Sequence, residues 1–200
     1  WKTVQDVVNF IAARAEVRAG DWAGLIAKIQ KINKGVSYHA QLIQQGEHTV
    51  LQLTDRRVAN THMTLQVDRG FRVVSHVVDG KERLRVPKAL NDLSGGIFLM
   101  GPLVNRNEGT KITRNGKTVD ISGLKGLSFD GTTGNPIHGI YRVAAWTDFD
   151  LQADDEHGIS ISASFATGDY PDSKLAEALG NSRTTLTWRL HRRDLTANVV

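Results

Sequence analysis

Two short segments carry the residues best suited to chemistry. The first ends in Asn105 and Arg106 and follows the apolar run 97–100, which we expect to be a buried strand. A guanidinium beside a buried strand needs partners for its planar donors, either a carboxylate or the hydroxyls of a ligand. The second segment contains His138, whose imidazole donates or accepts hydrogen bonds near neutral pH. Taken singly, Arg106 is explained as a structural ion-pair partner and His138 as a loop histidine satisfied by the protein.

His138 closes an unusually long glycine-rich loop. Glycine occurs five times between residues 123 and 139, whereas the other turns of the chain are short. A long loop within a compact meander of strands is typical of a binding or catalytic site. We therefore expect the functional site at this loop.

Several common kinds of site are excluded. The chain has no cysteine, and therefore no disulfide, thiolate metal site or cysteine nucleophile. It contains no Walker loop, no dinucleotide-binding fingerprint and no GxSxG motif. Its seven histidines do not occur at the spacings of metal ligands. We expect neither a metal nor a cofactor.

The charge pattern does not indicate a polyanionic partner. The 25 Lys and Arg residues exceed the 21 Asp and Glu residues by four, and the two signs are interleaved. We interpret the most basic stretch, 81–88, as a solvated face. The longest apolar run is too short to cross a bilayer. The sequence predicts a soluble protein that binds neither nucleic acid nor membrane, and it leaves the compartment and a homo-oligomeric state open.

The first 35 residues have a helical pattern. Apolar residues recur at helical spacing in two segments, with Thr3 and Asp21 as expected N-caps and Gly20 between them. This pattern predicts a helical hairpin over residues 1–35, whose apolar stripe packs on the following domain.

From residue 37 onward the hydrophobic period is two, which is typical of strands. The pairs Asp79-Gly80 and Asn115-Gly116 favour antiparallel hairpins, because both positions of such a turn need positive φ. We therefore expect a mainly β domain over 36–200, an antiparallel sandwich or barrel, with a short helix at 172–179. Strands are expected at 50–53, 63–67, 71–78, 83–86, 111–113, 117–121, 140–151, 158–165 and 184–190.

In this order, the segments resemble those of the aldose 1-epimerase, or galactose mutarotase, family. The run 95–106 is similar to the family's segment that ends in Asn-Arg, and 134–139 is similar to its Asn-x-x-His-Gly loop. Trp146 stands where a tryptophan usually follows that loop. Weaker likenesses extend the resemblance from about residue 47 to residue 200, at 65–84, 113–119 and 168–171.

The resemblance implies an antiparallel β-sandwich of the galactose mutarotase type that binds a free sugar. Mutarotation needs a base for the anomeric hydroxyl and an acid for the ring oxygen. By similarity, Arg106 binds sugar hydroxyls with support from Asn105, and His138 positions or polarises the sugar near its ring oxygen. The family's second histidine, its aspartate and its glutamate base have no assigned counterpart here. We therefore expect either a domain truncated at its C-terminal end or a divergent member.

Three functions are compatible with these residues. The leading one is a mutarotase-like isomerase that interconverts the anomers of an aldose or a sugar phosphate. The second is a non-catalytic carbohydrate-binding module that keeps Arg106 and His138 but lacks the base. The third is a β-rich carrier of a hydrophobic ligand, with the N-terminal helices as a lid.

Overall fold

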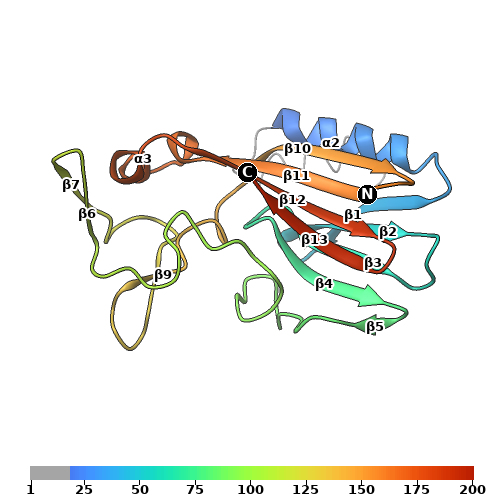
Figure 1. Cartoon of the computed structure of the whole chain (residues 1–200), viewed down its shortest axis with the longest axis horizontal. Coiled ribbons are helices and arrows are strands. Elements are labelled where there is room, and N and C mark those ends of the chain that lie inside the picture. The colour runs from blue at the N-terminus through green and yellow to red at the C-terminus, as the bar shows by residue number, and fades with distance from the viewer. Residues whose placement is uncertain (1–18) are drawn as a thin grey trace.

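Alternating apolar residues from Tyr38 onward build two antiparallel sheets that face each other across an apolar core (Figure 1). The computed structural model describes residues 19–200, so the first expected helix, with its cap at Thr3, lies outside the described residues. The first sheet has the order β1 (Tyr38–Gln45), β2 (His48–Asp55), β3 (His62–Gln66), β4 (Arg72–Val78) and β5 (Lys81–Glu82). The second has the order β10 (Thr147–Asp154), β11 (Gly158–Ala166), β12 (Arg183–His191) and β13 (Asp194–Val199).

The second expected helix is α2 (Ala19–Ile32), which packs along β10 and β1. Its apolar stripe joins the core through Trp22 and Ile29 among others, and the Trp22 ring lies 5.5 Å from that of Phe149. The stripe therefore packs on the sandwich, as its spacing predicts. The expected cap, Asp21, instead lies within the helix.

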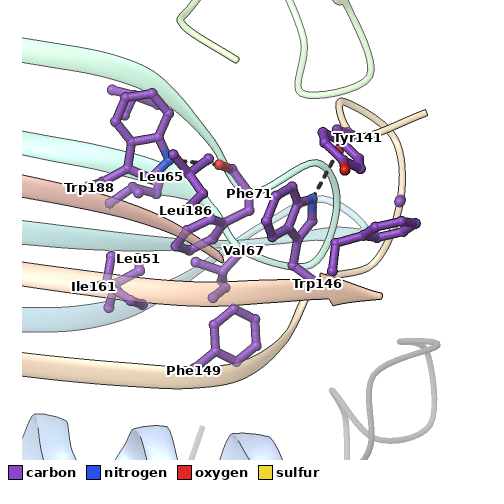
Figure 2. Close-up of a cluster of buried hydrophobic side chains, with 14 of the residues drawn as sticks. Leu51, Leu65, Val67, Phe71, Tyr141, Trp146, Phe149, Ile161, Leu186 and Trp188 are labelled. Carbon is purple, nitrogen blue, oxygen red and sulfur yellow. Dashed lines mark hydrogen bonds between the residues drawn. The ribbon is translucent and has the colours of Figure 1, made fainter. Parts of the chain in front are cut away.

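Two tryptophans are fixed in the core by hydrogen bonds, one between distant segments and one within a turn, as Figure 2 shows. The Trp188 indole on β12 donates its Nε1 hydrogen to the backbone oxygen of Phe71 at 2.8 Å, which ties the second sheet to the turn before β4. Trp146 donates in the same way to the oxygen of Tyr141 at 3.0 Å. Because a buried N–H without a partner is costly, each bond fixes its indole as well as packing it.

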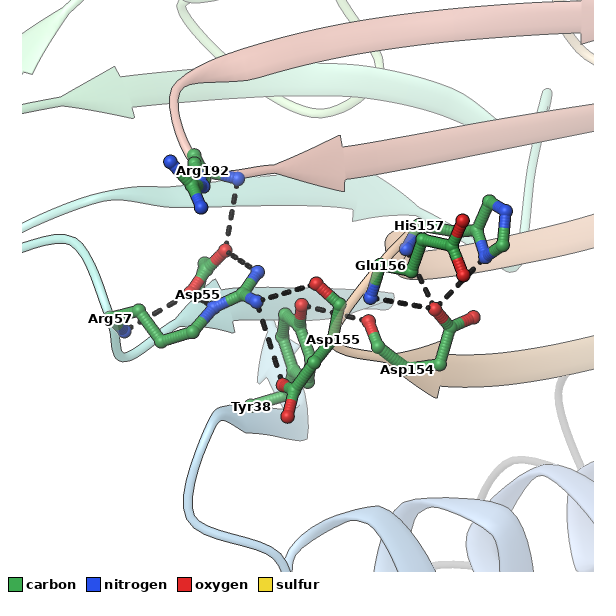
Figure 3. A network of polar contacts seen from close by, with 8 residues as sticks. All are labelled: Tyr38, Asp55, Arg57, Asp154, Asp155, Glu156, His157 and Arg192. Carbon is green, nitrogen blue, oxygen red and sulfur yellow. Dashed lines mark hydrogen bonds and ion pairs between the residues drawn. The ribbon is translucent and has the colours of Figure 1, made fainter.

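The buried carboxylate of Asp55, at the end of β2, lies at the centre of a polar network that connects the β12–β13 and β10–β11 turns (Figure 3). The Asp55 side chain is 0% exposed and accepts two side-chain hydrogen bonds from Arg57, at 2.9 and 2.7 Å, and one from the backbone N–H of Arg192 at 2.9 Å. Arg57 also donates to the backbone oxygen of Asp155 in the β10–β11 turn. Burial alone would raise the pKa of Asp55, but the hydrogen bonds from Arg57 and Arg192 outweigh it and lower that pKa.

The two expected glycine turns are confirmed. Asp79 and Gly80 have φ values of 50° and 76°, and they join β4 to β5. Asn115 and Gly116 have φ values of 50° and 77°, and they join β6 (Lys111–Arg114) to β7 (Lys117–Asp120). The expected strand 83–86 is absent, because β5 ends at Glu82.

Residues 83–146 leave the sandwich as a long excursion between β5 and β10 (Figure 1). Besides the β6–β7 hairpin, this excursion contains two short strands, β8 (Ser128–Phe129) and β9 (Pro136–Ile137). A short 3-10 helix, η1 (Thr167–Asp169), and α3 (Lys174–Leu179) connect β11 to β12 and confirm the expected helix at 172–179. None of the helices in the described range is long and apolar enough to cross a membrane.

Two predictions about the excursion are wrong. The run 97–100 is not a buried strand: Ile97 makes one isolated bridge to Val73, and Ile97 and Met100 are 37% and 40% exposed. The pair Gly95-Gly96 precedes the run without side chains to pack, and Gly101-Pro102 follows it, where the proline lacks an N–H donor, so the run is not continued as a sheet strand at either end. The expected strand 140–151 begins only at Thr147, because residues 140–146 turn back on themselves, with Ala144 N–H bonded to Ile140 O.

Candidate functional site

The backbone brings the two predicted site segments side by side. Arg106 and Ile137 form an antiparallel bridge. His138 N–H donates to the oxygen of Asn105 at 2.7 Å, and Asn107 N–H donates to the oxygen of Pro136 at 2.9 Å. Asn105, Arg106 and His138 are therefore neighbours in space, although more than thirty positions separate the two segments in the sequence.

Unusual backbone angles produce this approach. Asn105 and His138 have φ values of 55° and 64°, a region that side-chain-bearing residues rarely adopt. Gly139 follows with φ of 61°, and a Cβ on it would lie 2.3 Å from the backbone oxygen of Gly101. Only glycine fits at this crossing, so the Gly after His138 is a requirement of the geometry.

Arg106 is held by a carboxylate from the glycine-rich loop. Its Nε donates to Asp130 Oδ2 at 2.8 Å; the arginine side chain is 51% exposed and that of Asp130 is 10% exposed. Hydrogen bonds from Thr133 and from Arg106 lower the pKa of Asp130 to about 2. Asp130 is therefore ionised at neutral pH and orients the guanidinium through its Nε, and the arginine side chain remains half exposed.

His138 is half-buried beside the ring of Phe98, at a centroid distance of 6.3 Å in an edge-on arrangement. Its pKa is lowered first by burial and then by the positive charges of Arg142 and Arg106. The imidazole is consequently neutral near pH 7. Its Nδ1 makes no hydrogen bond with the described residues.

Sequence reasoning missed Arg142, which lies four positions after His138. This arginine is 8% exposed, and its guanidinium stands 6.0 Å from the centroid of the Phe98 ring, the same ring that His138 approaches. Burial, together with the charge of Arg69, lowers its pKa. No carboxylate within residues 19–200 forms an ion pair with it, and its Nε has no partner there. An arginine among apolar neighbours just after the His-Gly pair is the signal that could have found it.

Three side chains of this region have unused hydrogen-bonding capacity. Seven buried side-chain atoms lack a partner in the described chain; three of them belong to Asn107, His138 and Arg142, and the other four lie in α2 and in the first sheet and its turns. Buried polar groups in native proteins are nearly always paired, so the three atoms mark this region as a candidate ligand site. Cavities of about 590 and 690 Å³ lie elsewhere, beside β2–β4 and beside α2 and β10, and neither is lined by these residues. Across residues 19–200, no group of three or more His, Asp or Glu side chains is placed to hold a metal ion.

A search of solved structures identifies the architecture. A crystal structure of a galactose mutarotase-like protein from Clostridium acetobutylicum has a TM-score of 0.61 to this chain at 18% identity, over 84% of this chain. The match covers 49% of that protein, so the chain spans about half of its length. No family model and no curated protein matches the sequence. The fold is an antiparallel β-sandwich of the galactose mutarotase type, as the resemblance implied.

Proposed function

We propose that this protein is a mutarotase-like isomerase that interconverts the α and β anomers of an aldose by acid–base opening of the sugar ring. The observation that supports it most is the pairing of segments 101–107 and 136–139, which makes Arg106 and His138 neighbours. In this proposal Arg106 donates to vicinal hydroxyls of the sugar, and Asn105 supports it. Asp130 holds the guanidinium in one orientation, so that binding costs less side-chain entropy.

The reaction moves two protons. A base removes the proton of the anomeric hydroxyl, the bond between C1 and the ring oxygen breaks, and the ring oxygen gains a proton. His138, neutral because its pKa is lowered, donates an N–H hydrogen bond to the ring oxygen and polarises it; the proton that the ring oxygen gains comes from a solvent water, and the base returns its own proton to solvent. The open aldehyde then rotates about its C1–C2 bond, and the reverse steps close the ring as the other anomer.

A non-catalytic carbohydrate-binding module is the second candidate, and Asp130 is the observation that favours it. Asp130 is the carboxylate bonded to Arg106, yet a pKa of about 2 makes it a poor proton acceptor. Without another base, the site binds a sugar without turning it over. The hydrophobic-carrier alternative has less support, because the apolar stripe of α2 is buried in the core and is not free to cover a ligand.

Arg142 favours an anionic sugar over a neutral one. A buried guanidinium without a carboxylate partner is costly, and a phosphate is a charge-balancing, multi-acceptor partner for it. Arg142→Met should therefore remove any preference for glucose 6-phosphate over glucose. Because a methionine of similar length carries no unpaired charge, we expect the same variant to be about 1 kcal/mol more stable to urea. A variant that is both less stable and unchanged in preference would contradict this role.

Exchange NMR between the α and β anomeric protons of glucose, galactose and glucose 6-phosphate tests the main proposal. We expect the protein to accelerate exchange, and Arg106→Ala and His138→Ala to lower that acceleration by about 10²-fold or more. Arg193→Ala is a matched control, because Arg193 is a similarly exposed arginine paired with Asp79. Binding shifts without acceleration would favour the module, and neither effect would reject both candidates.

A further inference from the structure

A buried arginine of the first sheet holds the chain that leads into the candidate site. Arg72 begins β4 and is 0% exposed. Its Nε donates to Gln66 Oε1 at 2.9 Å, its Nη1 donates to the backbone oxygen of Asp92 at 2.9 Å, and its Nη2 donates to that of Leu90. Burial lowers the pKa of Arg72, so its charge is costly at this position. A methionine would fill similar space, but only the planar guanidinium holds two carbonyl oxygens at once.

The segment that this arginine holds is fixed to β4 a second time, through the main chain. Val73 and Ile97 exchange two backbone hydrogen bonds, at 3.0 and 2.8 Å. Gly96 lies so close to the strand that a Cβ on it would stand 2.3 Å from the Val73 oxygen. Segment 90–97 is therefore held near both of its ends, by an arginine side chain at one and by backbone pairing at the other. Phe98 is the next residue of the chain.

Phe98 carries the ring that two residues of the candidate site share. The ring centroid lies 6.3 Å from that of His138, and the guanidinium of Arg142 stands 6.0 Å from it. Because protein interiors are closely packed, a shift of this half-buried ring changes the positions open to both side chains. Such a shift matters to chemistry, since misplacing a reacting group by about 1 Å can lower a rate about 10²-fold.

We propose that Arg72 is a positioning residue for the candidate site. It holds segment 90–97 on β4 and thereby keeps the Phe98 ring against the imidazole and the guanidinium beside it. Without its donors, backbone pairing alone anchors the segment, and the ring moves away from the two side chains. The effect on catalysis rests on the proposed function, whereas the effect on the ring is measurable without a sugar.

Arg72→Met tests this role, with NMR and anomer exchange as the two measurements. The ring current of Phe98 shifts the imidazole proton signals of His138, and Phe98→Leu defines the full size of that shift. We expect Arg72→Met to lose most of the shift and to lower the acceleration of anomer exchange about 10-fold or more. The indole N–H signal of Trp188 should stay in place, because its bond to the turn before β4 is intact.

Arg57→Met is the matched control. Arg57 is also an arginine bonded to a backbone oxygen, but it holds the β10–β11 turn. Its loss should leave the His138 signals and the exchange rate unchanged, even where it lowers stability. A similar loss of both in Arg57→Met would show that general destabilisation, and not the hold on segment 90–97, moves the ring.

Gly96→Ala gives an independent test in which Arg72 keeps its donors. The added Cβ must lift the segment away from the Val73 oxygen, so we expect the same loss of the His138 shift. A shift that persists in both variants would overturn the positioning role, as would a displaced Phe98 ring with an unchanged exchange rate. A wild type that does not accelerate exchange would reject the proposed function, and the His138 shift would still decide whether Arg72 positions the ring.

Discussion

The sandwich and the excursion at 83–146 differ in how regularly their strands pair. The sandwich has long hairpins, of which β3–β4 and β10–β11 each contain one register shift, and a core that includes most of the fully buried aromatic side chains. The excursion has strands of two to four residues and isolated bridges, and it joins the same core through buried side chains such as Ile121, Ile140 and Trp146. Three of the seven unpartnered buried polar atoms in the described chain lie within it, in Asn107, His138 and Arg142, and the other four lie in α2 and the first sheet and its turns. The comparison indicates that regular strand pairing belongs to the sandwich, while the excursion brings three unpartnered polar groups near the predicted site segments.

The largest difference in stability between the two regions is expected when a core tryptophan of the sandwich is truncated. Trp188→Ala removes a buried indole from between the sheets and also its hydrogen bond to Phe71 O, so we expect a loss of about 3–5 kcal/mol in the free energy of unfolding. Phe129→Ala, at an exposed aromatic of the excursion, is the control and should change it by about 0.5 kcal/mol or less. Urea unfolding measures both. Equal losses of unfolding free energy in the two variants would show that the side chain at the excursion contributes as much to stability as the one in the sandwich core.

The buried carboxylate of the sandwich should give the next largest effect. Asp55→Asn keeps the shape but removes the charge that receives Arg57, so we expect a loss of about 2 kcal/mol. Asp79→Asn, which breaks the exposed pair with Arg193, should change stability little. If both variants lose the same unfolding free energy, the burial of Asp55 does not increase its contribution to stability.

The Asp55 effect should also depend on pH. Its pKa is lowered in the folded protein, so its contribution is present above the unfolded pKa of about 4 and is lost as the pH falls through the lower folded value. Unfolding free energy should therefore drop below pH 4 in the wild type and drop less steeply in Asp55→Asn. Parallel pH curves for the two proteins would contradict this assignment.

Local signals explain which parts of this structure were predictable. The Asp79-Gly80 and Asn115-Gly116 turns followed from φ preferences of two adjacent residues, and the stripe of α2 followed from its spacing. No strand was predicted at β1, and only the end of β13 was recognised as a strand, because polar residues such as Gln41 and Asn198 give no clean alternation. The prediction of a buried strand at 97–100 was wrong because it rested on hydrophobicity alone, and an apolar run becomes a strand only where a neighbouring strand pairs with it.

The candidate site was predictable only in part, for the same reason. The motifs predicted Asn105, Arg106 and His138, and the structure pairs the backbone segments that carry them; their roles stay predictions. Arg142 and Asp130 belong to the same cluster through tertiary contacts, namely the shared Phe98 ring and the bond to Arg106. A single sequence contains no signal for such contacts beyond residue type.

The smallest expected effects on stability are at two glycines of the excursion, only one of which lies at the predicted site. Gly116 and Gly139 have similar positive φ values, 77° and 61°, but a Cβ on Gly116 would meet nothing within 4 Å, whereas one on Gly139 would meet Gly101 O at 2.3 Å. Alanine at either position should cost about 1–2 kcal/mol for the left-handed backbone. Only Gly139→Ala should also shift the NMR signals of Arg106 and His138 and weaken sugar binding, because relieving its clash must separate segment 101–107 from 136–139. If Gly139→Ala leaves those signals in place, the close crossing at Gly101 is not what sets Arg106 beside His138.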